Sequence, residues 1–238
     1  CSIFALACSI LWAFPDTGAR LIVEGFMLVM ICPTATACAV VTQKLGGDSA
    51  ATTSYTITIN LVVAILCPLL LPIAHPQEGL SFVPAFMVII NKVFPLLIVP
   101  LFLAWFVRFL MPGFHRRIVN TKDLAVYMWA VSLAIAIAVT CKARGPSEEA
   151  MLKVGCVAIV TLMACLFQFG FGKWIGSRYG VRMEAGQALG QKNTVFIIWL
   201  GYTFLSPITA TAGGFYSIWH NVVNSYQLYR KRKETQEA

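Results

Sequence analysis

One lysine in the middle of a long apolar segment has the clearest chemical potential in this chain. Lys192 belongs to the run Gly-Gln-Ala-Leu-Gly-Gln-Lys-Asn-Thr, from Gly186 to Thr194. No acidic residue occupies a comparable depth in another apolar segment. A charge in the hydrocarbon layer is costly, and such residues usually face a water-filled or ligand-filled cavity. The sequence therefore predicts that Lys192 lines a binding site.

Other polar residues within apolar segments could line the same cavity. Thr52, Thr56 and Asn60 follow one another at four-residue spacing, which places them on one helix face. His220 and Asn221 lie in a later apolar segment. Two alternatives to a cavity-lining role are open. Threonine hydroxyls often donate to carbonyls of their own helix, and a lone histidine often only packs against its neighbours.

These residues do not form a catalytic or metal-binding pattern. The three histidines are scattered, and none of the eight cysteines is spaced with them as metal ligands are. Most cysteines lie within apolar segments, where we interpret them as small packing residues. We therefore expect no enzymatic activity, no bound metal and no cofactor.

Two segments have the composition of interrupted helices. In the run from Ile31 to Ala39, Pro33 stands among small residues, removes a backbone donor and clashes with the preceding turn. In the second segment, Gly186 and Gly190 precede Lys192. Secondary transporters build midplane binding sites from such breaks. The pattern predicts a transporter with Lys192 near its centre.

The composition is that of an integral membrane protein. Apolar residues make up 58% of the chain and charged residues 12%, whereas soluble domains are about a quarter charged. A helix needs about 20 apolar residues to cross the hydrocarbon layer, and the alternating pattern of a membrane β-barrel does not occur. We predict an all-α fold in the lipid bilayer with complete spans at Leu21–Gln43, Ala51–Ile73, Phe82–Met111, Leu124–Cys141, Met151–Phe171, Gln187–Leu205 and Ile208–Tyr229.

The basic residues predict how these spans are oriented. Most of them lie in the loops of one side and in the tail 230–238. Loops rich in Lys and Arg usually face the cytoplasm. We predict a multi-pass protein of the cell (inner) membrane with a cytoplasmic C-terminus, and interpret the net charge of +8 as a topology signal, not as nucleic-acid binding. Residues 1–14 are short for a span and lack the basic region of a signal peptide, so we expect the end of a helix that begins in a longer chain.

Three motifs resemble segments of the bile acid:sodium symporter family. The run Cys-Pro-Thr-Ala-Thr-Ala-Cys-Ala from Cys32, followed by Gly-Gly-Asp and a Thr-rich helix, resembles the first crossover segment of that family. The run Gly-Gln-Lys-Asn that ends at Asn193 resembles its second crossover, Glu-x-Gly-x-Gln-Asn. The run Ser-Ile-Trp-His-Asn that ends at Asn221 resembles the start of its final helix. The motifs occur in the family's order over essentially the whole chain.

The resemblance implies a ten-helix fold of two inverted repeats, with a core domain and a panel domain. On that template the chain supplies about seven complete helices and part of one more. Residues 1–14 end helix three, 21–73 complete the first repeat, 82–229 form the second repeat, and 230–238 form a basic tail. Each repeat contributes one broken helix, and the two cross at mid-membrane.

The function implied is secondary active transport of a small organic anion, bile-acid-like or carboxylate-like, by alternating access as in a symporter. The positive charge of Lys192 and the helix N-termini at the breaks favour a carboxylate. The substrate-binding residues expected are Thr36, Asn193, His220 and Asn221.

The chain departs from the family at the positions that bind sodium. The Ser-Asn pair of the first sodium site falls on Cys38 and Ala39, although its two hydroxyls are retained as Thr52 and Thr56. The shared glutamate falls on Ala188, and a glutamine of the second site falls on Lys192. A hard cation needs several oxygen ligands. These replacements argue against sodium coupling, and a proton carried by Lys192 is an alternative.

Three other functions fit parts of the sequence. Cys32 and Cys38 would suit an arsenite-type oxyanion efflux permease, and a non-transporting membrane sensor could use the same fold. A seven-helix photoreceptor would use Lys192 for a Schiff base, but it requires a carboxylate counterion that the sequence does not offer. We retain the transporter of an organic anion as the main hypothesis.

Overall fold

The computed structural model describes residues 18–75, 81–121, 124–142 and 148–237. Regular structure in these ranges is helical, and the only strand-like feature there is one isolated bridge between Thr34 and Lys192. The chain forms two compact units, Cys1–Thr56 with Leu133–Ala238, and Ile57–Ser132. The helix end expected for residues 1–14 lies outside the described residues.

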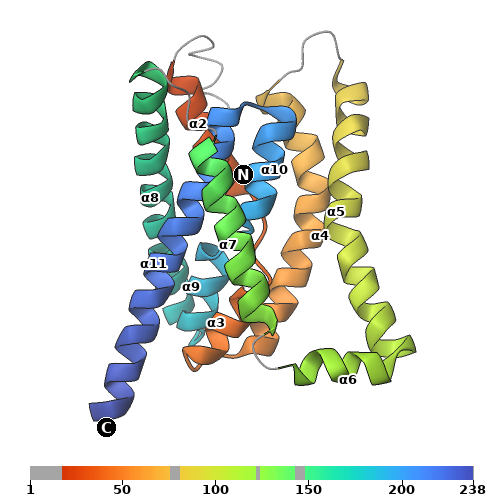
Figure 1. Ribbon diagram of the computed structural model, residues 1–238, viewed down its shortest axis with the longest axis vertical. Helices are drawn as coiled ribbons and strands as arrows, with labels where there is room; N and C mark the ends of the chain where they lie inside the picture. Colours follow the sequence, from red (N-terminus) through yellow and green to blue (C-terminus); the bar gives the residue numbers. More distant parts are fainter. Residues whose placement is uncertain (1–17, 76–80, 122–123, 143–147, 238) are drawn as a thin grey trace. The chain divides into compact units, whose positions relative to one another are not determined.

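The first unit contains both helix pairs that the sequence indicates as interrupted. Within it, α11 packs against α8, α10 and α2, and α8 packs against α9 and α2. Figure 1 shows α11 running beside α8 towards the C-terminus. The unit comprises α2 (Gly18–Ile31), α3 (Cys38–Lys44), the start of α4 (Ser49–Ala74), the end of α7 (Leu124–Lys142), α8 (Glu148–Ser177), α9 (Arg182–Gly190), α10 (Thr194–Phe204) and α11 (Pro207–Glu237).

The second unit contains the rest of α4, α5 (Phe82–Leu110), α6 (Pro112–Asn120) and the first part of α7. In α5 the buried residues include Ala85, Ile89 and Val93, whose four-residue spacing defines one packed stripe. The short helix α6 was not predicted. Its sequence Pro-Gly-Phe-His-Arg-Arg-Ile-Val-Asn buries no residue, and the proline at its start favours a new helix at that point.

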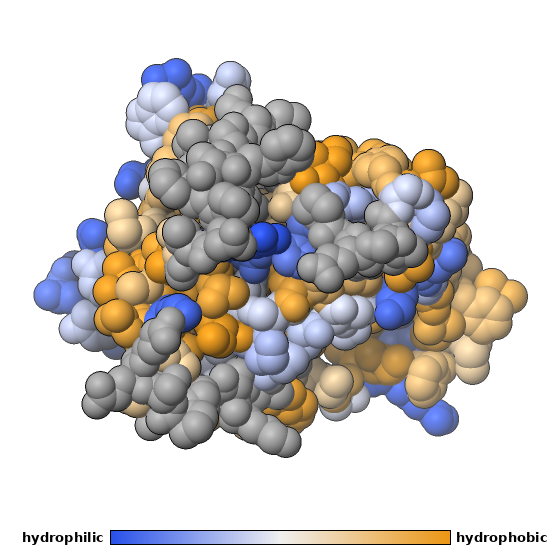
Figure 2. Space-filling model, turned by 90° about the horizontal axis from the view of Figure 1, so that it is seen from above, coloured by the Kyte–Doolittle hydropathy of each residue, from blue (hydrophilic) through white to orange (hydrophobic). Residues whose placement is uncertain are grey.

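The surface of the molecule is that of a membrane protein. Within the described residues, three helices are long and apolar enough to cross a membrane: Ser49–Ala74, Phe82–Leu110 and Ala150–Ser177. Large apolar side chains are widely exposed, as the orange residues in Figure 2 show. Leu152 and Phe109, for example, are 70% and 71% exposed. So much exposed apolar surface is typical of a protein in the lipid bilayer, and the all-α membrane class predicted from composition is confirmed.

Helix boundaries differ from the predicted spans at the broken helices and at the C-terminus. The span predicted from Gln187 begins earlier, because α9 starts at Arg182. The basic residues predicted as a tail form the last turns of α11, which continues to Glu237. In those turns Arg230 pairs with Glu234 at 3.4 Å, and Lys233 with Glu237 at 3.6 Å. Such pairs four residues apart support an exposed helix, which the hydropathy pattern does not reveal.

Candidate functional site at the helix crossing

The two unwound segments of the first unit meet through their backbones. Asn193 N–H donates to the carbonyl of Pro33 at 2.9 Å, and Ala35 N–H donates to the carbonyl of Gln191 at 3.0 Å. These bonds form the antiparallel bridge between Thr34 and Lys192. Helix α2 ends at Ile31 and α9 at Gly190, so both helices are interrupted where the sequence indicates.

The backbone groups released at the breaks are satisfied by nearby residues. Thr34 Oγ1 donates to the carbonyl of Ala188 at 2.6 Å, and Tyr216 OH donates to the carbonyl of Gly190 at 2.7 Å. At the start of α10, the Asn193 side chain accepts the Phe196 N–H at 3.2 Å. Each unpaired backbone group in an apolar environment raises the free energy of the folded state by roughly several kcal/mol. These hydrogen bonds therefore allow the backbone to be irregular at the crossing.

Lys192 lies in this crossing and is only 5% exposed. Its Nζ donates to the carbonyl of Cys32 at 3.1 Å. Because Cys32 follows the last residue of α2, the ammonium is placed at the negative end of that helix dipole. In the described part of the chain, no carboxylate forms an ion pair with Lys192. The crossing therefore has a buried positive charge held by backbone carbonyl oxygen.

The positions that the resemblance assigns to sodium ligands lie in α9, α3 and α4, and in the segment after α9. Ala188 is in α9, and its carbonyl accepts the Thr34 hydroxyl. Cys38 is the first residue of α3 and is fully buried, with Ala39 beside it. The two threonines of α4 are buried, and each donates four residues back along the chain: Thr52 to the carbonyl of Asp48, and Thr56 to that of Thr52, both at 2.8 Å.

The structure gives the four expected substrate-binding residues different environments. Thr36 is exposed, and Asn193 is half-buried and caps α10. His220 is 3% exposed and packs edge-on against the Tyr216 ring, with ring centroids 5.7 Å apart. Asn221 Nδ2 donates to the carbonyl of Ser217 in its own helix at 2.7 Å. Through Tyr216, His220 is linked to the end of α9.

Several buried polar atoms of α9, α11 and the segment after α9 have no hydrogen-bond partner among the described residues. They include Nδ1 of His220, Oδ1 of Asn221, Oε1 of Gln191 and both side-chain polar atoms of Gln187 and Asn224. Buried polar atoms are normally paired, so these are available to water or to a ligand. Gln187 and Gln191 were not singled out in the sequence, although their place on either side of Ala188 was a usable signal.

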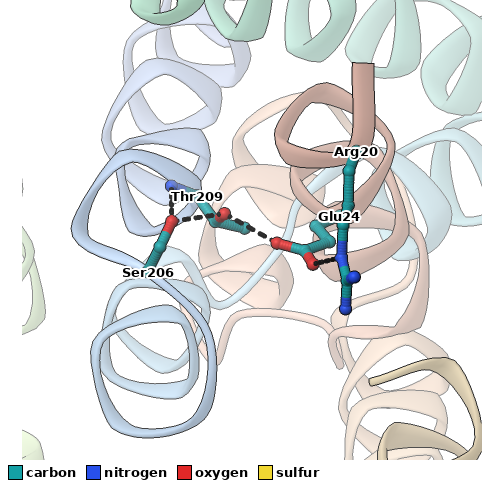
Figure 3. A network of polar contacts seen from close by, with 4 residues as sticks. All are labelled: Arg20, Glu24, Ser206 and Thr209. Carbon is teal, nitrogen blue, oxygen red and sulfur yellow. Dashed lines mark hydrogen bonds and ion pairs between the residues drawn. The ribbon is translucent and has the colours of Figure 1, made fainter. Parts of the chain in front are cut away.

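A second buried charge, Glu24 of α2, was also missed. It is 2% exposed, and Figure 3 shows its carboxylate between two helices. Arg20 Nε donates to its Oε1 and Thr209 Oγ1 donates to its Oε2, both at 3.0 Å. Ser206 Oγ lies 2.8 Å from Thr209 Oγ1 and accepts the Thr209 N–H at 3.0 Å. The four-residue spacing of Arg20 and Glu24 was the available signal, but Thr209 is distant in sequence.

Comparison with known families identifies the family of this chain. A model of the SBF-like CPA transporter family (DUF4137) matches residues 1–203. The chain belongs to this family. The resemblance to bile acid:sodium symporters is thereby confirmed. Individual curated proteins give no match.

Membership in the SBF-like family supports a class of function. The family is one of membrane transporters, which agrees with the exposed apolar surface and with the crossed, interrupted helices. The protein is therefore assigned to the multi-pass membrane transporters.

Proposed function

We propose that this SBF-like protein is a secondary active transporter of small organic anions in which Lys192 takes the place of a coupling sodium ion. The observation that carries the proposal is the bond from the Lys192 ammonium to the Cys32 carbonyl at the helix crossing. A fixed cation there offsets the partial negative charge of the Cys32 carbonyl oxygen, so no metal ion is needed for this purpose. The same charge attracts the carboxylate of a substrate.

The residues around the crossing fit this role better than they fit sodium. A hard cation prefers several oxygen ligands, including carboxylates. On the resemblance described above, Ala188 stands where the family has a glutamate, and Lys192 stands where it has a glutamine that could offer oxygen. Two hydroxyl oxygens are retained, those of Thr52 and Thr56, and two are too few for such a cation. A second positive charge beside Lys192 would be repelled strongly in a medium of low dielectric constant.

The substrate class follows from the charge and the remaining polar groups. An anion would be attracted by Lys192, and the buried polar atoms of Gln187, Gln191, His220 and Asn221 offer neutral hydrogen bonds. A small carboxylate with further polar groups suits this set. Movement of the substrate by alternating access requires no covalent step.

The test is ligand binding with sodium and without it. Thermal unfolding of the detergent-solubilised full chain would be measured against a panel of carboxylates, in sodium chloride and in choline chloride. We expect a stabilising ligand whose effect is equal in the two salts. The Lys192→Met variant should bind it at least about tenfold more weakly, because a charged hydrogen bond contributes about 1.5–3 kcal/mol.

Two variants control this experiment. Lys192→Arg keeps the positive charge and should retain most of the ligand shift, whereas Lys92→Met removes an exposed lysine of the apolar helix α5 and should change nothing. A shift that requires sodium in the unmodified protein would contradict the proposal. Full binding by a folded Lys192→Met variant would contradict it as well.

A further inference from the structure

A groove lined by basic and apolar side chains opens between α8, α9 and α11 of the first unit. Its volume is about 700 Å³, and its wall includes Leu166 and Lys173 of α8, Arg182 of α9, and Tyr226 and Arg230 of α11. We propose that this groove binds one anionic phospholipid. The phosphate would lie among the basic residues, and the acyl chains along the apolar part.

The basic side chains of the groove are not balanced by acids. Lys173, Arg182, Arg230 and Lys231 line it with one carboxylate, that of Glu234. Arg182 and Arg230 are close enough to Lys173 to act on it electrostatically. Glu234 pairs with Arg230, and across the described ranges no other carboxylate pairs with these basic residues. Such a cluster repels itself and favours a phosphate, which arginine can bind with two parallel hydrogen bonds.

The apolar part of the groove points to a lipid as the source of that phosphate. Leu166, Val222 and Tyr226 line it and are 54%, 58% and 61% exposed. Along α8, Lys173 lies about 10 Å beyond Leu166, and along α11, Arg230 lies about 12 Å beyond Val222. Both helices thus change from apolar to basic over the length that separates acyl chains from a headgroup. A free phosphate would not need the apolar wall.

A lipid in this position would act on the broken helix α9. A side chain at Gly186 would meet the stem of Lys173, with a Cβ only 2.6 Å from Lys173 Cγ, so that stem packs directly on α9. Arg182 is the first residue of α9, and α9 ends at Gly190, just before the crossing. A phosphate shared by Lys173 and Arg182 therefore ties α9 to α8 and should stabilise the first unit.

The experiment compares three ligands of matched concentration on the delipidated full chain in detergent. They are dioctanoyl phosphatidylglycerol, dioctanoyl phosphatidylcholine and glycerol 3-phosphate. We expect a saturable rise in the thermal unfolding midpoint with phosphatidylglycerol alone. An equal rise with phosphatidylcholine would show that charge plays no part, and an equal rise with glycerol 3-phosphate would show a site for free phosphate. Either result overturns the proposal.

Charge removal locates the site. The double variant Lys173→Gln, Arg182→Gln should bind phosphatidylglycerol about thirtyfold more weakly, since each basic residue near an anionic lipid accounts for about a fivefold change. The matched control is Arg178→Gln, because Arg178 lies between the two but stacks on the Trp174 ring at 4.1 Å and does not line the groove. Equal weakening in the control and the double variant would contradict this location.

A second measurement needs no variant. A photoactivatable phosphatidylglycerol would be crosslinked to the unmodified protein, and the labelled peptides identified by mass spectrometry. Labels on residues 166–173 and 222–231 support the groove, and labels confined to other helices refute it. Neither experiment involves transport, sodium or Lys192, so this inference and the proposed function fail independently.

Discussion

Two buried charges in the first unit have different partners and therefore different tasks. Lys192 donates to a backbone carbonyl at the crossing, whereas Glu24 accepts from the side chains of Arg20 and Thr209. Along α2, Glu24 precedes Cys32 by about 12 Å, so it is remote from the ammonium in that direction. Because Thr209 belongs to α11, its bond to the Glu24 carboxylate is suited to holding α2 and α11 together.

The bond between Glu24 and Thr209 should contribute measurably to stability. Thr209→Val removes the hydroxyl with little change of shape, and leaves one carboxylate oxygen without this donor. We expect the free energy of unfolding to fall by about 1–3 kcal/mol. Equilibrium unfolding in mixed micelles would measure it, and a double-mutant cycle with Glu24→Gln should show coupling of the two sites.

Thr211→Val is the matched control for this change. Thr211 is also buried in α11, but its hydroxyl donates to the carbonyl of Ile208 in the same helix. Its replacement should be milder and should not couple to Glu24→Gln. Additive effects of Thr209→Val and Glu24→Gln would show that the bond between α2 and α11 has no energetic role.

At the scale of the elements, close helix approach depends on glycine in α10 and α11. A Cβ at Gly213 would lie 2.7 Å from the Thr194 carbonyl oxygen and 2.9 Å from Ile198 N, both backbone atoms of α10. A Cβ at Gly201 would lie 2.6 Å from Ala210 Cα. Small residues commonly allow such contact between membrane helices. The close packing of α10 on α11 thus depends on the absence of side chains at Gly201 and Gly213.

Gly213→Ala should therefore destabilise the protein, by about 1–3 kcal/mol, because backbone atoms cannot move aside as a flexible side chain can. Gly155→Ala is the control, since a Cβ at Gly155 of α8 would meet nothing within 4 Å. That change should be neutral or stabilising by up to about 1 kcal/mol, as expected for a helix interior. Unfolding measurements on both variants would check the opposite signs, and equal effects would refute the packing explanation.

At the scale of the whole molecule, our proposal makes the sodium site implied by the resemblance and the lysine of this chain alternatives within one fold. Restoring family-like residues by Ala188→Glu, Lys192→Gln, Cys38→Ser and Ala39→Asn should create sodium dependence of ligand binding or stability. The new carboxylate, hydroxyl and amide oxygens would replace the lost ligands. Thermal unfolding in sodium and choline salts would measure it, with the Cys38→Ser, Ala39→Asn pair as the control. A folded fourfold variant that ignores sodium would contradict our account of the site.

The sequence alone was sufficient for the membrane class, the helical fold and the two breaks. Each of these depends on local properties. Long apolar runs require a hydrocarbon environment, Pro33 removes a helical hydrogen bond, and the glycines before Lys192 weaken the helix there. The family could also be inferred, because its motifs are short and contiguous. The short helix α6 and the helical C-terminus were missed, since neither leaves a hydropathy signal.

Tertiary structure alone decided which distant groups meet. Nothing local to Lys192 indicates that its ammonium bonds the Cys32 carbonyl, or that Thr34 donates to Ala188, because these pairs are joined only by the crossing of two helices. The same holds for Glu24 with Thr209. Local sequence determines where a helix must break, but the partner of a released carbonyl or a buried charge depends on the packing of segments more than 150 residues apart.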